Sequence, residues 1–127
     1  EISDVQATKD AVYFQGASAT KPPQIVRLDL ATGETTTLAA SASVEEEIVP
    51  YLSEPETLAL PREDGSPIHA YFYPPMNPDY AAPEGEKPPV IVQVHGGPTA
   101  RRSNAFDLRV QYWTSRGFAW LDVNYGG

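Results

Sequence analysis

The sequence predicts an α/β fold in which an antiparallel β-sheet precedes a β-β-β-α-β succession. Before residue 40, short β-forming runs alternate with turn residues, which predicts a meander. After residue 88, an apolar run, a helical pattern and a second apolar run follow one another. Two strands joined by a helix in this way are parallel, with a right-handed crossover. The expected fold is therefore a meander followed by the beginning of a mixed sheet.

Composition excludes several classes of function. The chain has 127 residues, no cysteine and a formal net charge of −8. Nucleic acids are held by neutralising phosphates, so this charge gives them little support. No apolar run reaches the roughly 18 residues of a membrane span, and disulfide and thiolate chemistry is absent. The acidic run at 45–47 is interpreted as a solvated linker. We therefore expect no nucleic acid, membrane, metal or cofactor partner, and a cytoplasmic location.

Residues 1–40 are predicted to contain a β-meander. Residues 11–17 are rich in β-formers, residues 25–30 alternate apolar and polar side chains, and residues 35–38 follow a Thr-Gly turn. This succession is typical of one blade of a β-propeller, but any antiparallel hairpin shares it, and no repeat is present to decide. Residues 41–55 lack periodicity and are predicted to be a linker containing a helical turn.

A hairpin is predicted next. Residues 56–61 and 68–73 are β-forming runs, and the Asp64-Gly65 pair between them is a strong turn signal. His69 lies within the second run with no nucleophile near it in the sequence, so we assign it no role. Residues 74–88 are rich in proline and are expected to form an extended connection.

The strand and loop that follow carry the strongest signal for function. Residues 90–94 are mostly β-branched and predict a strand buried on both faces. The strand ends in His95-Gly96-Gly97-Pro98, and because Pro98 has no N–H, the free amide donors here are those of Gly96, Gly97 and Thr99. The two glycines also let a ligand approach the backbone closely. Two glycine amides at the carboxyl end of a strand form a candidate oxyanion hole. A glycine-rich turn without chemistry is the alternative.

A helix over residues 105–116 is predicted after this loop. Asn104 is a suitable N-cap with Asp107 three residues on, and Gly117 is suited to the left-handed residue that ends a helix. Residues 118–123 are then expected to form a second buried strand. The expected apolar face of the helix comprises Phe106, Val110 and Trp113.

Two kinds of ligand binding are alternatives for this region. The loop lacks the G-x-G-x-x-G and G-x-x-x-x-G-K-[ST] patterns that cradle phosphates, so a doubly wound nucleotide-binding domain is disfavoured. Arg101 and Arg102 are candidates for binding an anion or a substrate carboxylate, but two exposed arginines before a helix are the favoured interpretation.

The β-β-β-α-β order is how an α/β-hydrolase sheet begins, and three motifs then resemble one family. They are the Asp64-Gly65 turn with residues 68–74, residues 90–98 with the HGGP loop, and residues 112–118 with 122–127. In this order they resemble the prolyl oligopeptidase family, most closely its acylaminoacyl-peptidase and dipeptidyl-aminopeptidase branch. The resemblance implies a serine peptidase gated by a propeller that cleaves short peptides or acylated amino acids.

The resemblance also implies domains and roles. Residues 1–40 correspond to the last propeller blade region, 41–55 to a linker and 56–127 to the N-terminal part of the α/β-hydrolase domain. By the family pattern, the Gly97 amide donates to the oxyanion, Gly96 shapes the loop, and His95 braces it where the oligopeptidase branch carries a tyrosine. Residues 124–127 depart from the commoner Asn-Tyr-Arg-Gly, so a substrate contact from that arginine is absent.

No Gly-x-Ser-x-Gly motif occurs in the sequence, and the hydrolase order of serine, aspartate and histidine places all three after Gly127. We therefore expect an internal fragment, truncated before the nucleophile and inactive alone, whose parent takes a short peptide substrate. Cut strand edges predict self-association or a homo-oligomer. The alternatives are a fragment of an esterase or lipase that uses the same loop, and a non-catalytic β-rich interaction module.

Overall fold

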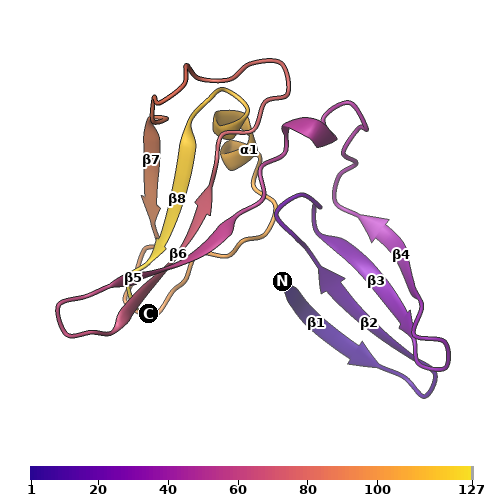
Figure 1. Cartoon of the computed structure of the whole chain (residues 1–127). Coiled ribbons are helices and arrows are strands. Elements are labelled where there is room, and N and C mark those ends of the chain that lie inside the picture. Colours follow the sequence, from indigo (N-terminus) through magenta and orange to yellow (C-terminus); the bar gives the residue numbers. More distant parts are fainter. Residues whose placement is uncertain (127) are drawn as a thin grey trace.

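The computed structural model describes residues 1–126 and shows a mostly β protein with two four-stranded sheets (Figure 1). Gly127, the last residue of the predicted C-terminal turn, lies outside the described residues. The predicted α/β class holds only in part, because the helices in the described range are one α-helix and one 3-10 turn.

The first sheet is antiparallel throughout, in the order β1-β2-β3-β4. Three of its strands confirm the predicted meander, whereas β1 was not predicted. All six residues of β1 are exposed, so the strand has no burial pattern that a sequence could display. Its place is set by pairing with β2 instead. The strands are β1 (Ile2–Ala7), β2 (Ala11–Gly16), β3 (Gln24–Asp29) and β4 (Thr35–Ala40).

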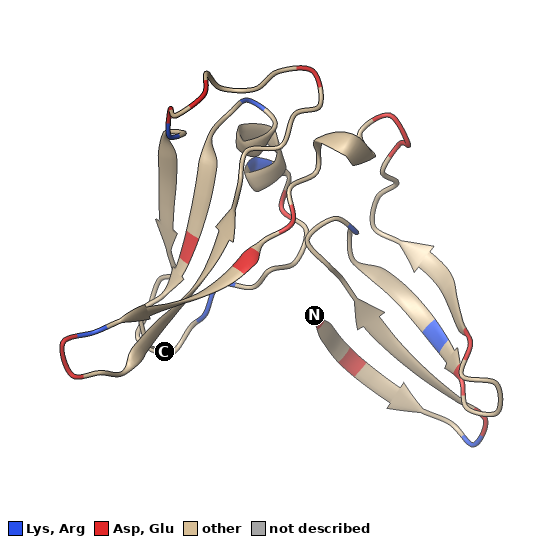
Figure 2. Ribbon diagram, in the orientation of Figure 1, with Lys and Arg blue, Asp and Glu red and all other residues tan. Residues whose placement is uncertain are grey.

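The linker between the sheets is anchored rather than free. It contains the 3-10 helix η1 (Val49–Tyr51), which confirms the predicted helical turn. Leu52 and Ser53 directly after it are 7% and 0% exposed. Charged residues lie mainly at turns and connections, including the acidic segment before η1 (Figure 2). The linker is therefore solvated over its acidic part and packed where it enters the second sheet.

The second sheet has the order β5-β6-β8-β7. Its elements confirm the predicted β-β-β-α-β order and the hairpin, with β5, β6 and β8 antiparallel neighbours and β7 parallel to β8. The helix lies against this sheet near β8 (Figure 1). The elements are β5 (Glu56–Pro61), β6 (Pro67–Tyr73), β7 (Val90–Val94), α1 (Leu108–Thr114) and β8 (Ala119–Asn124).

The prediction that β7 is buried on both faces is wrong for residues 1–126. Within this range β7 is an edge strand whose neighbour is β8. Val90, Val92 and Val94 are 52%, 57% and 52% exposed, while Ile91 packs against the core cluster. The apolar composition of β7 predicts its burial, but burial also requires a covering element, and no described element lies over this face.

The helix differs from its predicted bounds. It begins after Asp107, whose carboxylate accepts a hydrogen bond from the Arg109 amide at 2.8 Å, so Asp107 rather than Asn104 is the N-cap. The prediction that Phe106 and Trp113 share the buried face with Val110 is also wrong. The buried residues of α1 are Val110, Gln111 and Thr114. The left-handed Gly117, with φ +87°, ends this segment as predicted.

The core is small and joins the two sheets. Its central cluster combines Tyr73 of β6, Val110 of α1 and Trp120 of β8 with Ala19, which lies between β2 and β3. Burial raises the pKa of the Tyr73 phenol well above its ordinary value, so this side chain is neutral inside the core. Because Ala19 lies in the connection between two strands of the first sheet, this cluster joins that connection to the second sheet and its helix.

Candidate functional site

The glycine loop leaves β7 at its carboxyl end, as the sequence predicts. Gly97 has φ +74°, a left-handed conformation that glycine adopts without strain. Gly96 and Gly97 are exposed, and within residues 1–126 neither amide donates a hydrogen bond. The loop therefore presents two exposed amide donors at the carboxyl end of β7.

His95 opens this loop but is buried. His95 is only 7% exposed. Its imidazole ring stacks on the ring of Tyr125, with the ring centroids 4.2 Å apart and an angle of 8° between the ring planes. Among the described residues, neither ring nitrogen has a hydrogen-bond partner. His95 therefore contributes to the loop through stacking in this structure.

Tyr125 also contacts the backbone of the loop. Its hydroxyl lies 3.2 Å from the carbonyl oxygen of His95 and 3.1 Å from that of Gly97. These two carbonyls flank the Gly96–Gly97 peptide. Sequence analysis included Tyr125 in a family motif but did not assign it a contact with the loop.

The far end of the loop is attached to β8. The Arg102 side chain donates from Nε to Asp122 at 3.0 Å, and its backbone amide donates to Asn124 Oδ1 at 2.6 Å. Asp122 is only 1% exposed and also accepts a hydrogen bond from Trp120 Nε1 at 3.0 Å. The sequence signal that could have indicated this attachment is the pair Asp122 and Asn124, two polar residues at alternate positions of an otherwise apolar strand.

This geometry corrects the alternatives for the arginine pair. Arg102 is not exposed but is engaged by a buried carboxylate, which leaves it committed to the fold rather than to an anionic ligand. The Arg101 side chain is 72% exposed, and its Nη2 lies 3.4 Å from Oε1 of Glu1. His69 is exposed on β6, where it pairs with Asn124 of β8.

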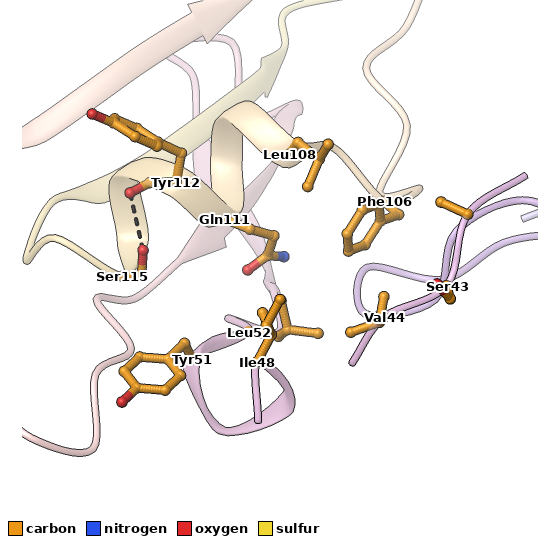
Figure 3. A pocket seen from close by; sticks show the side chains of 11 residues that line it. Ser43, Val44, Ile48, Tyr51, Leu52, Phe106, Leu108, Gln111, Tyr112 and Ser115 are labelled. Atoms are coloured by element: carbon orange, nitrogen blue, oxygen red, sulfur yellow. Dashed lines mark hydrogen bonds between the residues drawn. The ribbon is translucent and has the colours of Figure 1, made fainter. Parts of the chain in front are cut away.

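A separate apolar groove lies between the linker and α1 (Figure 3). It has a volume of about 450 Å³, and its lining includes no residue of the glycine loop.

Gln111 of α1 lines this groove and connects three segments of the chain through hydrogen bonds. Its Oε1 accepts from the Ser53 amide at 2.7 Å, and its Nε2 donates to the Ser53 and Ala19 carbonyls at 3.1 and 3.0 Å. The sequence pattern did not predict this role of Gln111, because a polar residue of an amphipathic helix is expected on the solvent face.

Residues 1–126 contain no group of three or more histidine, cysteine, aspartate or glutamate side chains arranged to hold a metal ion. The α-helix of this range is too short to cross a membrane.

Comparisons with known proteins identify relatives of the whole described fold. No protein-family model matches the sequence, and no curated protein matches it. Among solved structures, a puromycin-hydrolysing peptidase of Mycobacterium tuberculosis is 43% identical with a TM-score of 0.88, over 95% of this chain and 19% of that chain. A puromycin hydrolase is 35% identical with a TM-score of 0.84, and the match covers 99% of this chain and 20% of that chain. An acylaminoacyl peptidase of Pyrococcus horikoshii is 26% identical with a TM-score of 0.70, and the match covers 97% of this chain and 18% of that chain.

The chain therefore spans about one fifth of the length of the structures it matches, at 18 to 20% of each. Fold and similarity define a segment related to peptidases. The family predicted from the sequence motifs is confirmed, because the chain is related to the prolyl oligopeptidase family over at least 95% of its length.

Proposed function

We propose that this chain is part of a serine peptidase of the prolyl oligopeptidase family and contributes its oxyanion-binding loop. Residues 1–40 are assigned to the last propeller blade region, 41–55 to the linker, and 56–127 to the beginning of the α/β-hydrolase domain. The observation that carries the proposal is the pair of exposed amides at Gly96 and Gly97, at the carboxyl end of β7, which donate no hydrogen bond to another residue of the range 1–126.

The chemistry follows from these donors. In acyl transfer a serine oxygen attacks the substrate carbonyl, and negative charge develops on the carbonyl oxygen. Amides that already point at this oxygen stabilise the charge without rearranging, and one such donor contributes about 2.7 to 4 kcal/mol. The sequence has no Gly-x-Ser-x-Gly motif, so the nucleophile and its base belong to the rest of the enzyme. The chain alone is then inactive.

The proposed substrates are short peptides and acylated amino acids. The relatives at 43% and 35% identity hydrolyse puromycin, so puromycin is included among the substrates to be tested. A panel of aminoacyl and acylaminoacyl anilides, puromycin and short acyl esters would be assayed with the full-length protein that contains this chain. Preference for the amides supports a peptidase, and preference for the esters would indicate an esterase or lipase instead.

The role of Gly97 is tested in the same full-length protein. Replacing Gly97 by proline removes the amide donor, and kcat is expected to fall 100- to 1,000-fold. Gly97→Ala keeps the amide but strains the left-handed backbone, so its loss should be smaller. Gly96→Ala is the matched control, because a Cβ there meets nothing within 4 Å and its φ is not left-handed.

Near-normal kcat in the Gly97→Pro variant would refute the assignment of Gly97. Labelling with a fluorophosphonate provides the independent check on the class of enzyme. The full-length protein should gain one adduct, whereas the 127-residue chain should gain none. A full-length protein without an adduct would favour a non-catalytic interaction module.

A further inference from the structure

We propose that Tyr125 is a positioning residue that sets the direction in which the Gly96 and Gly97 amides point. The inference rests on the proposed function, because it concerns the same oxyanion-binding loop. It assigns to Tyr125 two separable actions, one through the aromatic ring and one through the hydroxyl.

The ring acts on the first residue of the loop. Tyr125 stacks on the buried His95 imidazole with the two planes nearly parallel, 8° apart at a centroid distance of 4.2 Å. Stacking over this area restricts rotation of the imidazole and holds the Cα of His95 in place. His95 follows Val94 directly, so the contact fixes the point where the chain leaves β7.

The hydroxyl acts on the peptide planes. It lies within hydrogen-bond distance of the His95 carbonyl and of the Gly97 carbonyl, at 3.2 and 3.1 Å. In a trans peptide the carbonyl and the next amide point in opposite directions. Holding the His95 carbonyl toward Tyr125 therefore directs the Gly96 amide away from Tyr125. The hydroxyl has a single proton, which is shared between the two carbonyls. Its contact with the Gly97 carbonyl limits rotation on the other side of the Gly96–Gly97 peptide, which carries the Gly97 amide.

Tyr125 is itself connected to neighbouring parts of the second sheet. Val94 of β7 pairs in parallel with Val123 of β8, so Tyr125 comes two residues after a registered pair and lies at the same sheet end as the loop. The residue before Tyr125 is Asn124, which is hydrogen-bonded to both the amide and the carbonyl of Arg102. The guanidinium of Arg62, from the β5–β6 hairpin, donates to the Tyr125 carbonyl. Tyr125 is thus held from two sides while it holds the loop.

The test compares variants of the full-length protein. Tyr125→Phe keeps the ring stack and removes the hydroxyl, and kcat is expected to fall about tenfold while KM changes less than about twofold. Tyr125→Leu removes both actions and should lower kcat by about 100-fold. Tyr80→Phe is the matched control, because Tyr80 is 81% exposed in the proline-rich connection. It should behave as wild type.

A second readout separates positioning from general stability. A peptide aldehyde forms a tetrahedral adduct whose oxygen occupies the oxyanion position, whereas a product peptide does not. Tyr125→Phe should weaken the aldehyde by the same factor as kcat and leave product binding and the melting temperature unchanged. Equal kcat in Tyr125→Phe and Tyr80→Phe would overturn the inference, as would a loss confined to KM or to the melting temperature.

The outcomes also distinguish the inference from the function on which it rests. An active, fluorophosphonate-labelled wild type with an unaffected Tyr125→Phe variant refutes the role of Tyr125 and leaves the proposed function standing. A wild type that neither hydrolyses the panel nor takes the label refutes the proposed function, and the positioning role with it.

Discussion

Gln111 offers a direct test of how the two sheets are joined. Its buried amide is hydrogen-bonded to the backbone of Ser53 in the linker and of Ala19 in the β2–β3 connection. We consider Gln111→Met, which keeps the length of the side chain and its helical propensity but removes both polar atoms. The change leaves the backbone groups of two buried residues without these partners, since Ser53 and Ala19 are 0% and 7% exposed.

The magnitude follows from the desolvation of these groups. A buried donor or acceptor left unpaired costs about 1–3 kcal/mol. The Ser53 amide loses its acceptor outright and accounts for about 2 kcal/mol. Each of the two carbonyls loses a single donor, and we assign them about 1 kcal/mol together because a carbonyl has a second lone pair. The free energy of unfolding is therefore expected to fall by about 3 kcal/mol, a large share of the stability of a small domain.

The assay is urea denaturation of the chain, followed by tryptophan fluorescence, because Trp120 lies in the shared core. With a urea m-value of about 2 kcal/mol/M, the midpoint should fall by about 1.5 M. Gln93→Met is the matched control, since Gln93 makes one exposed hydrogen bond to the adjacent Val94 carbonyl. It should change stability by less than about 0.5 kcal/mol. Equal midpoints for the two variants would refute the reasoning, because Gln111 would then not join the sheets.

Three further predictions concern stability and association. The Arg102→Met variant leaves the buried Asp122 carboxylate without its cation, and its free energy of unfolding should fall by about 3 kcal/mol. Arg101 is exposed, so the Arg101→Met variant should lose less than about 1 kcal/mol. Similar urea midpoints for the two variants would contradict this prediction. The hydrogen bond from Arg109 lowers the pKa of Asp107 in the folded state. The ionised Asp107 carboxylate therefore stabilises the fold above about pH 4, and this stabilisation is lost as the pH falls through the lowered pKa. Asp107→Ala should therefore cost about 1 kcal/mol at pH 7 and less at pH 3, and a constant difference in urea midpoints at both pH values would refute this account. A lysine in place of the exposed β7 residue Val92 should reduce self-association of the chain in sedimentation velocity, and undiminished association would show that the β7 edge is not responsible.

Features set by neighbouring residues were predictable from the sequence. The Asp64-Gly65 pair predicted the hairpin between β5 and β6, and Gly117 predicted the end of the helical segment. The glycine loop was also correctly placed at the end of β7, because a β-branched run followed by two glycines specifies strand and turn locally. The three motifs in residues 64–74, 90–98 and 112–127, taken in this order, predicted the family, which the similarity to solved structures confirms.

Most of the strands, their turns and the loop that carries the candidate chemistry therefore follow from local patterns in the amino-acid sequence, with β1 as the exception. Which surfaces are covered and which distant residues meet depends on how the sheets assemble. Gln111 is buried because backbone groups from two other segments satisfy its amide, and β7 is exposed because no described element covers it. Tyr125 meets His95 across 30 residues because β7 and β8 are paired in register. Local patterns reflect the preferences of neighbouring residues, whereas these contacts depend on strand order and register, which are properties of the assembled sheet.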